Sequence, residues 1–276
     1  MTQTLDVATD PAVREVTPPR ITLLGDFNCP FSYLASRRAA VLAAHGLRVD
    51  WHAVEHAPWV ARRYTDSSVR FACLQEEVDK VRSLLLPREE LPFAPAGFLP
   101  YTKAAVTAYA EAYAAGRAAE VRRLLFDAFW LHGTDLGNAR TVRALLVDAL
   151  RAASSRSEAV REWGYAVDVT GGPVSTRAWR LVRQWREEWL ATGKETVPTA
   201  VVDGGETYFG LEALEWLAAE LGRRGIEPGD VPPSAPARPR PHVADLADHA
   251  WVSQHGNRWM RDFRDAATRP PFPHVS

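Results

Sequence analysis

The chain reads Ile21-Thr22-Leu23-Leu24-Gly25-Asp26-Phe27-Asn28-Cys29-Pro30-Phe31-Ser32 where its first apolar run meets its first cysteine. The apolar run predicts a short strand, and the residues after it predict a helix that begins at the cysteine. Pro30 suits the first position of this helix, where a backbone N–H has no partner. Because free N–H groups at a helix N-terminus stabilise a thiolate, we expect Cys29 to be an activated thiol with a lowered pKa.

Ser32 stands where a Cys-x-x-Cys redox motif would carry its second cysteine. Its hydroxyl can donate a hydrogen bond to the sulfur of Cys29, but it cannot resolve a mixed disulfide. The sequence therefore predicts a nucleophile at Cys29 with Ser32 as its partner, and no vicinal disulfide.

The pattern around this motif predicts a βαβ unit. A helix is expected over residues 31–44, closed by Gly46, and an alternating strand over residues 47–54. Such a unit implies two parallel strands with a right-handed crossover. Residues 60–190 carry mainly helical patterns, and strand signals return at residues 199–202 and 206–210 around a turn. A last amphipathic helix is expected over residues 211–221.

Composition narrows the classes of function. The chain has 276 residues, a net charge of −1 and two cysteines. A balanced charge gives no reason to expect nucleic acid or a membrane as partner, and no apolar stretch is long enough to span a bilayer. Two cysteines make no disulfide framework, and the scattered histidines suggest no metal site. Without an apolar signal segment in residues 1–19, which predict a disordered leader, the protein is expected to be cytoplasmic.

Four segments in this order resemble the DsbA-like family, which includes FrnE-type thiol–disulfide oxidoreductases, 2-hydroxychromene-2-carboxylate isomerases and kappa-class glutathione transferases. The segments are 26–35, 125–136, 196–202 and 209–211. The resemblance implies an α/β protein with a thioredoxin-like fold and an inserted all-helical domain. We expect the thioredoxin-like halves at 20–56 and 191–227, the insertion at 57–190, and a Pro-rich linker with a docking segment at 228–276.

The resemblance also implies the residues of a site. Val197 and Pro198 match the family's cis-proline segment, which holds a peptide-like thiol substrate through the backbone of the residue before the proline. Pro30 and Phe31 match the substrate-side residues of the active-site segment. The chain fits neither subfamily pattern fully. FrnE-type oxidoreductases would carry cysteine at the position of Ser32, whereas the isomerases and transferases typically carry serine at the position of Cys29.

Three functions stay open on this pattern. The first is a thiol–disulfide oxidoreductase that works through mixed disulfides of Cys29 with a small thiol or a protein thiol. Glutathione, mycothiol or another low-molecular-weight thiol would be its co-substrate, with no tightly bound cofactor. The second is a thiol-dependent isomerase or transferase for a small aromatic substrate, with a pocket lined by Trp59, Phe93, Phe98, Tyr101 and Trp130. The third is a catalytically silent binding module.

Several other residues receive structural interpretations. Cys73 lies in an apolar context that favours an inert buried thiol over a resolving cysteine. Asp26 is interpreted as a turn or cap residue rather than as a proton carrier for Cys29. The tryptophans of residues 177–190 are expected to pack in the core. Trp251 and Trp259 predict a helix that docks on the domain or on a second subunit of a homodimer.

Overall fold

The computed structural model describes residues 20–56, 67–93, 98–154 and 156–229. These residues form a sheet with the strand order β2-β1-β3-β4. β1 (Arg20–Gly25) pairs in parallel with β2 (Arg48–Ala53) and antiparallel with β3 (Thr199–Val202), which pairs antiparallel with β4 (Thr207–Phe209). The parallel βαβ unit and the returning hairpin are therefore confirmed, and the fold is α/β and thioredoxin-like.

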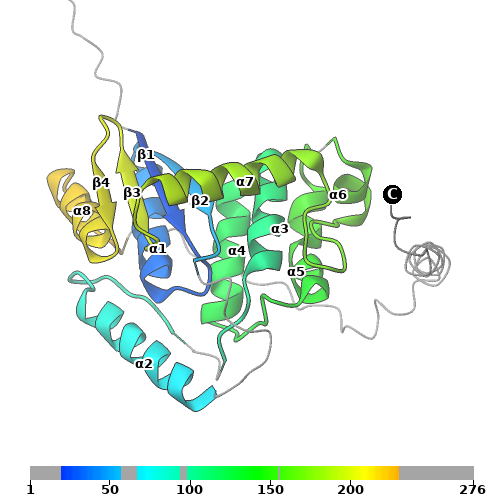
Figure 1. Cartoon of the computed structure of the whole chain (residues 1–276). Helices are drawn as coiled ribbons and strands as arrows, with labels where there is room; N and C mark the ends of the chain where they lie inside the picture. The colour runs from blue at the N-terminus through cyan, green and yellow to red at the C-terminus, as the bar shows by residue number, and fades with distance from the viewer. Residues whose placement is uncertain (1–19, 57–66, 94–97, 155, 230–276) are drawn as a thin grey trace, which may run out of the picture. The chain divides into compact units, whose positions relative to one another are not determined.

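Helices lie at both edges of this sheet (Figure 1). α1 (Pro30–Ala44) connects β1 to β2, and α8 (Leu211–Arg223) follows β4 and packs against α1. Between β2 and β3 the described residues form α2 (Ser67–Ser83), α3 (Lys103–Ala114), α4 (Ala118–Trp130), α5 (Ala139–Arg151), α6 (Glu158–Trp163) and α7 (Thr176–Ala191). Figure 1 shows α3 to α7 gathered at the β2 edge of the sheet and α8 at the β4 edge.

Local chemistry explains where several of these helices begin. Pro30 occupies the first turn of α1, as predicted. Asn138, Ser157 and Ser175 precede α5, α6 and α7, and each side chain accepts a hydrogen bond from a backbone N–H of the first turn. The short α6 is a helix that the apolar pattern did not predict, although its Ser157 cap and the left-handed Gly164 at its end are both visible in the sequence.

β2 departs from the alternation that predicted it. Trp51, His52 and Ala53 are all buried, because α1 packs against β2 as do α3 and α7. The polar residue among them is satisfied: His52 Nδ1 lies 2.7 Å from Glu188 Oε2 of α7, and its ring stacks on Trp185 at 5.2 Å. Both faces of the strand are therefore covered, and burial of His52 depends on a partner from a distant helix.

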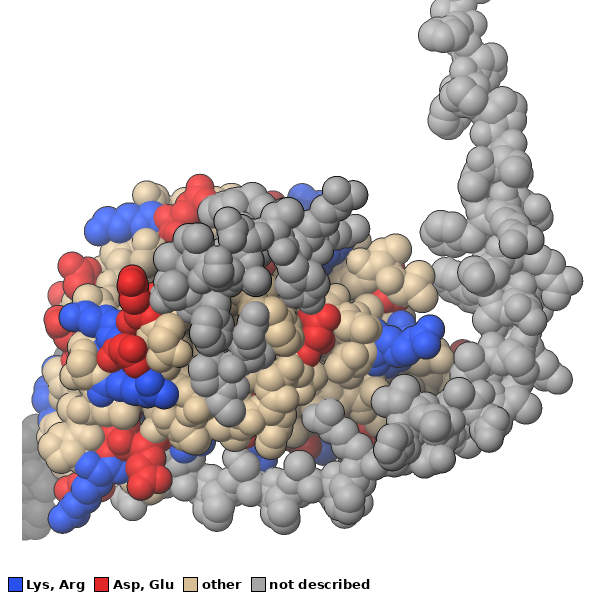
Figure 2. Space-filling model, turned by 90° about the horizontal axis from the view of Figure 1, so that it is seen from below, with Lys and Arg blue, Asp and Glu red and all other residues tan. Residues whose placement is uncertain are grey.

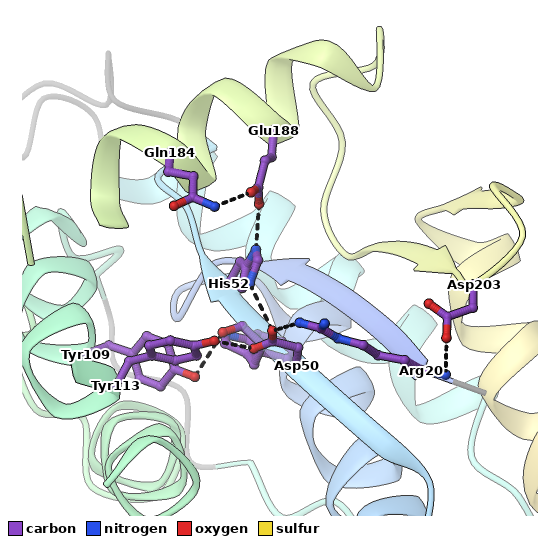
Figure 3. A network of polar contacts seen from close by, with 9 residues as sticks. Arg20, Asp50, His52, Tyr109, Tyr113, Gln184, Glu188 and Asp203 are labelled. Atoms are coloured by element: carbon purple, nitrogen blue, oxygen red, sulfur yellow. Dashed lines mark hydrogen bonds and ion pairs between the residues drawn. The ribbon is translucent and has the colours of Figure 1, made fainter. Parts of the chain in front are cut away.

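A polar network joins the sheet edge to the helical insertion (Figure 3). Asp50 Oδ2 accepts from Arg20 Nη2 at 2.5 Å and lies 3.5 Å from His52 Nε2, while Tyr113 Oη donates to Asp50 Oδ1 at 2.9 Å. Burial alone would raise the pKa of Asp50, but these hydrogen bonds outweigh it and lower the pKa to about 2. The network thus links β1, β2 and α3 directly, and α7 through Glu188.

Removing this carboxylate should weaken the fold. We expect Asp50→Asn to lower the free energy of unfolding by about 2 kcal/mol at pH 7. Because the folded pKa of Asp50 is depressed, its contribution is present above about pH 4 and is lost as the pH falls towards 2. Urea titrations at a series of pH values should show a flatter acid limb in the variant. Asp79→Asn, which removes an exposed partner of Arg82, should change stability by less than about 0.5 kcal/mol, and an equal loss in the two variants would contradict the assignment.

The surface gives two further observations. The tryptophans expected in the core divide: Trp185 and Trp189 are buried, but Trp179 is 50% exposed, so that part of the prediction is wrong. Trp179 precedes Trp185 by six residues, so it projects from another side of the helix. On the face drawn in Figure 2, basic and acidic side chains are interspersed. No helix of the described residues is long and apolar enough to cross a bilayer.

Candidate functional site

Cys29 is the residue that immediately precedes α1. Its backbone is extended, with φ −95° and ψ 121°, and its carbonyl accepts from Tyr33 N at 3.0 Å, which closes the first helical turn. Its own N–H donates to Asp26 O at 3.3 Å. Cys29 is a free cysteine with 6% of its surface exposed. The predicted position at a helix start is therefore confirmed, but the sulfur is more enclosed than a helix terminus at a surface would leave it.

The structure brings the two halves of the predicted site together. Cys29 Sγ lies 3.8 Å from Val197 O, across 168 positions of the sequence. The Val197–Pro198 peptide bond is cis, and Pro198 O accepts from Gly210 N at 2.8 Å. The backbone that the resemblance implies for substrate binding is thus in contact with the sulfur. Pro30 is buried beside it in α1, and Phe31 is partly buried against the core.

Ser32 is fully buried beneath Cys29. Its Oγ accepts from Asp26 N at 3.3 Å, and both its backbone and its hydroxyl stabilise the thiolate form of Cys29 through hydrogen bonds. The structure therefore places Ser32 where its hydroxyl can reach the sulfur, as the sequence predicts for a partner that cannot form a disulfide. Cys73 lies in α2, and its side chain is outside the described residues, as are the leader 1–19, Trp59 and the docking segment.

The expected lowering of the thiol pKa is wrong for this structure. Burial raises the pKa of Cys29 to about 12, and the carboxylates of Glu77 and Asp26 add to the effect, while Ser32 opposes it. Desolvation disfavours a thiolate more than one helix terminus and one hydroxyl favour it. Cys29 is thus a neutral thiol in this structure. For its sulfur to act as a nucleophile, the sulfur must become exposed to solvent or the nearby carboxylates must be neutralised.

A carboxylate–imidazole pair lies next to Cys29 and was not predicted. Asp26 is 1% exposed, and its Oδ2 accepts from His56 N at 2.9 Å and from His56 Nδ1 at 2.8 Å. Burial alone would lower the pKa of His56, but the hydrogen bond and charge of Asp26 raise it overall. Asp26 therefore does more than form a turn, since its carbonyl closes the turn at Cys29 while its carboxylate pairs with a histidine.

A signal for this pair exists in the sequence. Gly25 and Ala53 are partners at the ends of the parallel strands β1 and β2. Because the carboxyl ends of parallel strands meet at one edge, residues shortly after them lie close together. Asp26 follows β1 directly and His56 follows β2 after two residues, so their proximity could have been inferred once the strands were assigned.

A second acid lies at the same edge. Burial and the Asp26 carboxylate raise the pKa of Glu55 to about 7, although Lys103, Arg186 and Tyr101 oppose the shift. The edge therefore holds two carboxyl groups that repel one another and a histidine that pairs with one of them.

One of the aromatic residues expected to line a substrate pocket packs in the interior instead. Trp130 is fully buried, and its Nε1 donates to Phe27 O at 3.0 Å. Phe93 packs edge-on against Trp130 at 5.4 Å, and Phe98 packs against Phe129 at 6.2 Å. Trp130 is therefore a core residue, whereas Phe93, Phe98 and Tyr101 are half-buried. The spacing of aromatic residues in the sequence could not distinguish packing in the core from lining a pocket.

Comparison with known proteins shows which family profile and which solved structures this chain resembles. Residues 20–222 match the sequence profile of the DSBA-like thioredoxin domain. A 2-hydroxychromene-2-carboxylate isomerase has a similar structure with a TM-score of 0.54 at 20% identity, over 75% of this chain and 96% of its own. A probable DsbA oxidoreductase from Streptomyces coelicolor gives 0.52 at 17% identity, over 79% and 94%. The cytosolic disulfide reductase DsbM from Pseudomonas aeruginosa gives 0.52 at 16% identity, over 75% and 98%.

At these identities the similarity of structure shows the fold alone, and no curated protein matches the sequence. The profile match is the stronger finding, because it covers well over half of the chain and includes Cys29, Ser32 and Val197–Pro198. The chain therefore belongs to the DsbA-like thioredoxin domain family.

Proposed function

We propose that the protein is a thiol–disulfide oxidoreductase that works through Cys29 alone. Members of the DsbA-like family are generally oxidoreductases or isomerases. The observation that favours exchange chemistry is the contact between Cys29 Sγ and Val197 O beside the cis Pro198, with Ser32 in place of a second cysteine. A disulfide substrate lying along the Val197 backbone would present its sulfur to Cys29.

The exchange needs only a disulfide and a thiol. Cys29 loses its proton, and the thiolate attacks one sulfur of the substrate disulfide. A bond forms between Cys29 Sγ and that sulfur, the substrate S–S bond breaks, and the other sulfur leaves as a thiolate that takes up a proton. An external thiol then attacks the mixed disulfide and restores Cys29, because Ser32 cannot. Glutathione, mycothiol or a protein thiol would fill this role in a reducing cytoplasm.

The raised thiol pKa makes a prediction about rate. Since little thiolate exists at neutral pH, exchange should be slow there and should accelerate about tenfold per pH unit wherever the thiol alone titrates. A thiolate of high pKa is intrinsically more nucleophilic, which offsets part of this loss.

The raised pKa of the Cys29 thiol also supports a second candidate function. A neutral S–H can donate a hydrogen bond to a bound thiolate, as a serine hydroxyl would. Cys29 would then serve a thiol-dependent isomerase or transferase that binds glutathione or an equivalent without bonding to it. The similarity of the fold to a 2-hydroxychromene-2-carboxylate isomerase favours keeping this candidate.

Intact-mass spectrometry separates the two candidates. The Cys73→Ser protein is incubated with glutathione disulfide at pH 8 and quenched in acid. We expect one glutathione adduct per chain, removed by added glutathione and absent when Cys29 is also replaced by alanine. Ser32→Ala should slow the adduct but not abolish it, because only a hydrogen bond to the sulfur is lost.

The alternative predicts a different pattern. Reduced glutathione would raise the melting temperature of the Cys73→Ser protein without forming an adduct, even under mild oxidant. Thermal stabilisation with no adduct would overturn the exchange proposal in favour of the isomerase or transferase. Absence of both effects with glutathione and with mycothiol would favour the silent binding module.

A further inference from the structure

The pair formed by Asp26 and His56 has no part in the exchange described above. The two side chains differ in exposure: the Asp26 carboxylate is nearly inaccessible, while the His56 side chain is 30% exposed and reaches solvent. Its two hydrogen bonds, of 2.8 and 2.9 Å, are typical of a charge-assisted contact. A buried carboxylate in contact with a solvent-accessible imidazole changes its local charge when the imidazole titrates.

This pair is built into the turn that carries Cys29. Asp26 O accepts from Cys29 N, and Asp26 N donates to Ser32 Oγ, so the aspartate is bonded to both ends of the motif. Its second oxygen, Oδ1, is buried, and the described residues offer it no hydrogen-bond partner. The charge of this carboxylate is therefore compensated from one side only, by His56, and it acts on the sulfur through a poorly solvated interior.

We propose that the Asp26–His56 pair controls the ionisation of Cys29 through the protonation state of the imidazole. With the imidazolium present, the pair is neutral overall and adds no repulsion to a thiolate at Cys29. When His56 loses its proton, the Asp26 carboxylate stands uncompensated and repels a thiolate at Cys29. The biological meaning of this control rests on the proposed exchange, but the control itself does not.

Other charged groups face these residues and set the background. Glu77 of α2 acts on both Cys29 and His56. Glu55 lies on the same segment as His56 and interacts with Asp26, and it is balanced by Lys103 of α3 and Arg186 of α7. Ser32 donates to the thiolate but carries no charge. Glu55, whose pKa is about 7, also loses a proton near physiological pH, but it acts on Asp26 through its charge, whereas His56 bonds directly to Asp26.

The pH profile of thiol reactivity tests the proposal. In the Cys73→Ser background, the rate of alkylation by iodoacetamide is followed from pH 5 to 10. We expect the logarithm of the rate to rise along two parallel lines joined by a shoulder, at a pH above the ordinary histidine value of about 6.5. The line below the shoulder should lie about tenfold above the extrapolated upper line, the factor expected for one nearby charge in a partly solvated site.

His56→Gln keeps a side chain that can donate to Asp26 but cannot carry charge. We expect its profile to lose the shoulder, to match the wild type at high pH and to be about tenfold slower at low pH. Asp26→Asn should raise the rate throughout and move the shoulder to lower pH, because the imidazole loses its anionic partner. Circular dichroism melting confirms that each variant folds.

Two variants are matched controls. His45→Gln removes a histidine at the far end of α1, where its Nδ1 lies 2.9 Å from Val41 O, and should leave the profile unchanged. Glu77→Gln should raise the whole profile and keep the shoulder, because the imidazole remains. These controls separate a titrating pair from a general change of charge.

The outcomes distinguish the proposal from a structural role and from the exchange reaction. A purely structural pair would give a wild-type profile without a shoulder, or a uniform change of rate in His56→Gln at every pH, and either result would overturn the proposal. If the shoulder behaves as expected but glutathione disulfide forms no adduct, the control of Cys29 stands and the exchange function fails.

Discussion

Replacing Ser32 by cysteine is expected to convert Cys29 from a single reactive thiol into half of a disulfide. In the Cys73→Ser background, the reaction of Cys29 with Ellman's reagent should release one thiolate half of the reagent. The other half should stay bound to Cys29 as a mixed disulfide. The Ser32→Cys variant should release both, because its new cysteine displaces the bound group. Absorbance of the released thiolate, with mass spectrometry of the product, measures the difference.

The geometry supports a large effect. Cys29 and Ser32 are three residues apart at the start of α1, which sets their Cα atoms at roughly 5 Å, within the range that a disulfide spans. Ser32 Oγ is already placed to hydrogen-bond the sulfur. An intramolecular thiol at this distance has a very high effective concentration, so release from the mixed disulfide should accelerate by at least about 100-fold over the Ser32 protein.

Ser36→Cys is the matched control. Ser36 is buried in the same helix, but it is seven residues from Cys29, about 10 Å along the axis, too far for a disulfide. This variant should still hold one mixed disulfide at Cys29. Intact mass should show that the mixed disulfide at Cys29 is lost in Ser32→Cys and kept in Ser36→Cys, whatever thiolate the new buried thiol releases. Its retention in Ser32→Cys, or its loss from Ser36→Cys, would contradict the placement of position 32 beside the sulfur.

The parts of the site that local sequence determines could be predicted. A strand followed by Cys29 and Pro30 fixes a helix start, because Pro30 fits the first turn and the preceding apolar run ends there. The contact between Cys29 and Val197 spans 168 positions, and only the family resemblance linked them in advance. Spacing along the chain carries no information on such a contact.

The electrostatic state of the site could not be predicted. The helix terminus and Ser32 both favour the thiolate, and both can be inferred from the motif. The opposing effects, namely burial and the charges of Glu77 and Asp26, depend on how α2 and the segment after β2 close around the sulfur. For the same reason His56 was missed, since its meaning depends on the pairing of β1 with β2.

Burial within helices was predicted only in part. Periodicity placed α7 correctly, but it could not decide which tryptophans face inwards, and Trp179 is half exposed. Likewise β2 alternates in sequence but is covered on both faces, so His52 is buried through its bond to Glu188. In both elements the neighbour on each face, rather than the pattern, decides burial.

Gly25→Ala is expected to destabilise the fold strongly. Gly25 ends β1 beneath the active-site turn, and a methyl group there would lie 2.4 Å from Trp51 Cζ2, 2.6 Å from Trp51 Cη2 and 3.1 Å from Ser32 Oγ. The indole is 2% exposed, packs edge-on against Phe126 at 5.7 Å and lies under the Arg122 guanidinium. Because the ring has no free space to enter, we expect a loss of about 3 kcal/mol in the free energy of unfolding.

Urea unfolding followed by circular dichroism measures this loss, and two comparisons give it a physical cause. Gly222→Ala lies in α8, where an added methyl group meets nothing within 4 Å, so helix propensity should keep or slightly raise stability. Trp51→Phe removes the benzo ring that contains Cζ2 and Cη2. As a single substitution it creates a cavity, but in the double variant this space accommodates the methyl group of Gly25→Ala. The double variant should therefore be about 2 kcal/mol more stable than the sum of the single losses predicts. Simple additivity would mean that the methyl group clashes elsewhere, with Ser32 as the remaining contact, and the alkylation rate of Cys29 would then change as well.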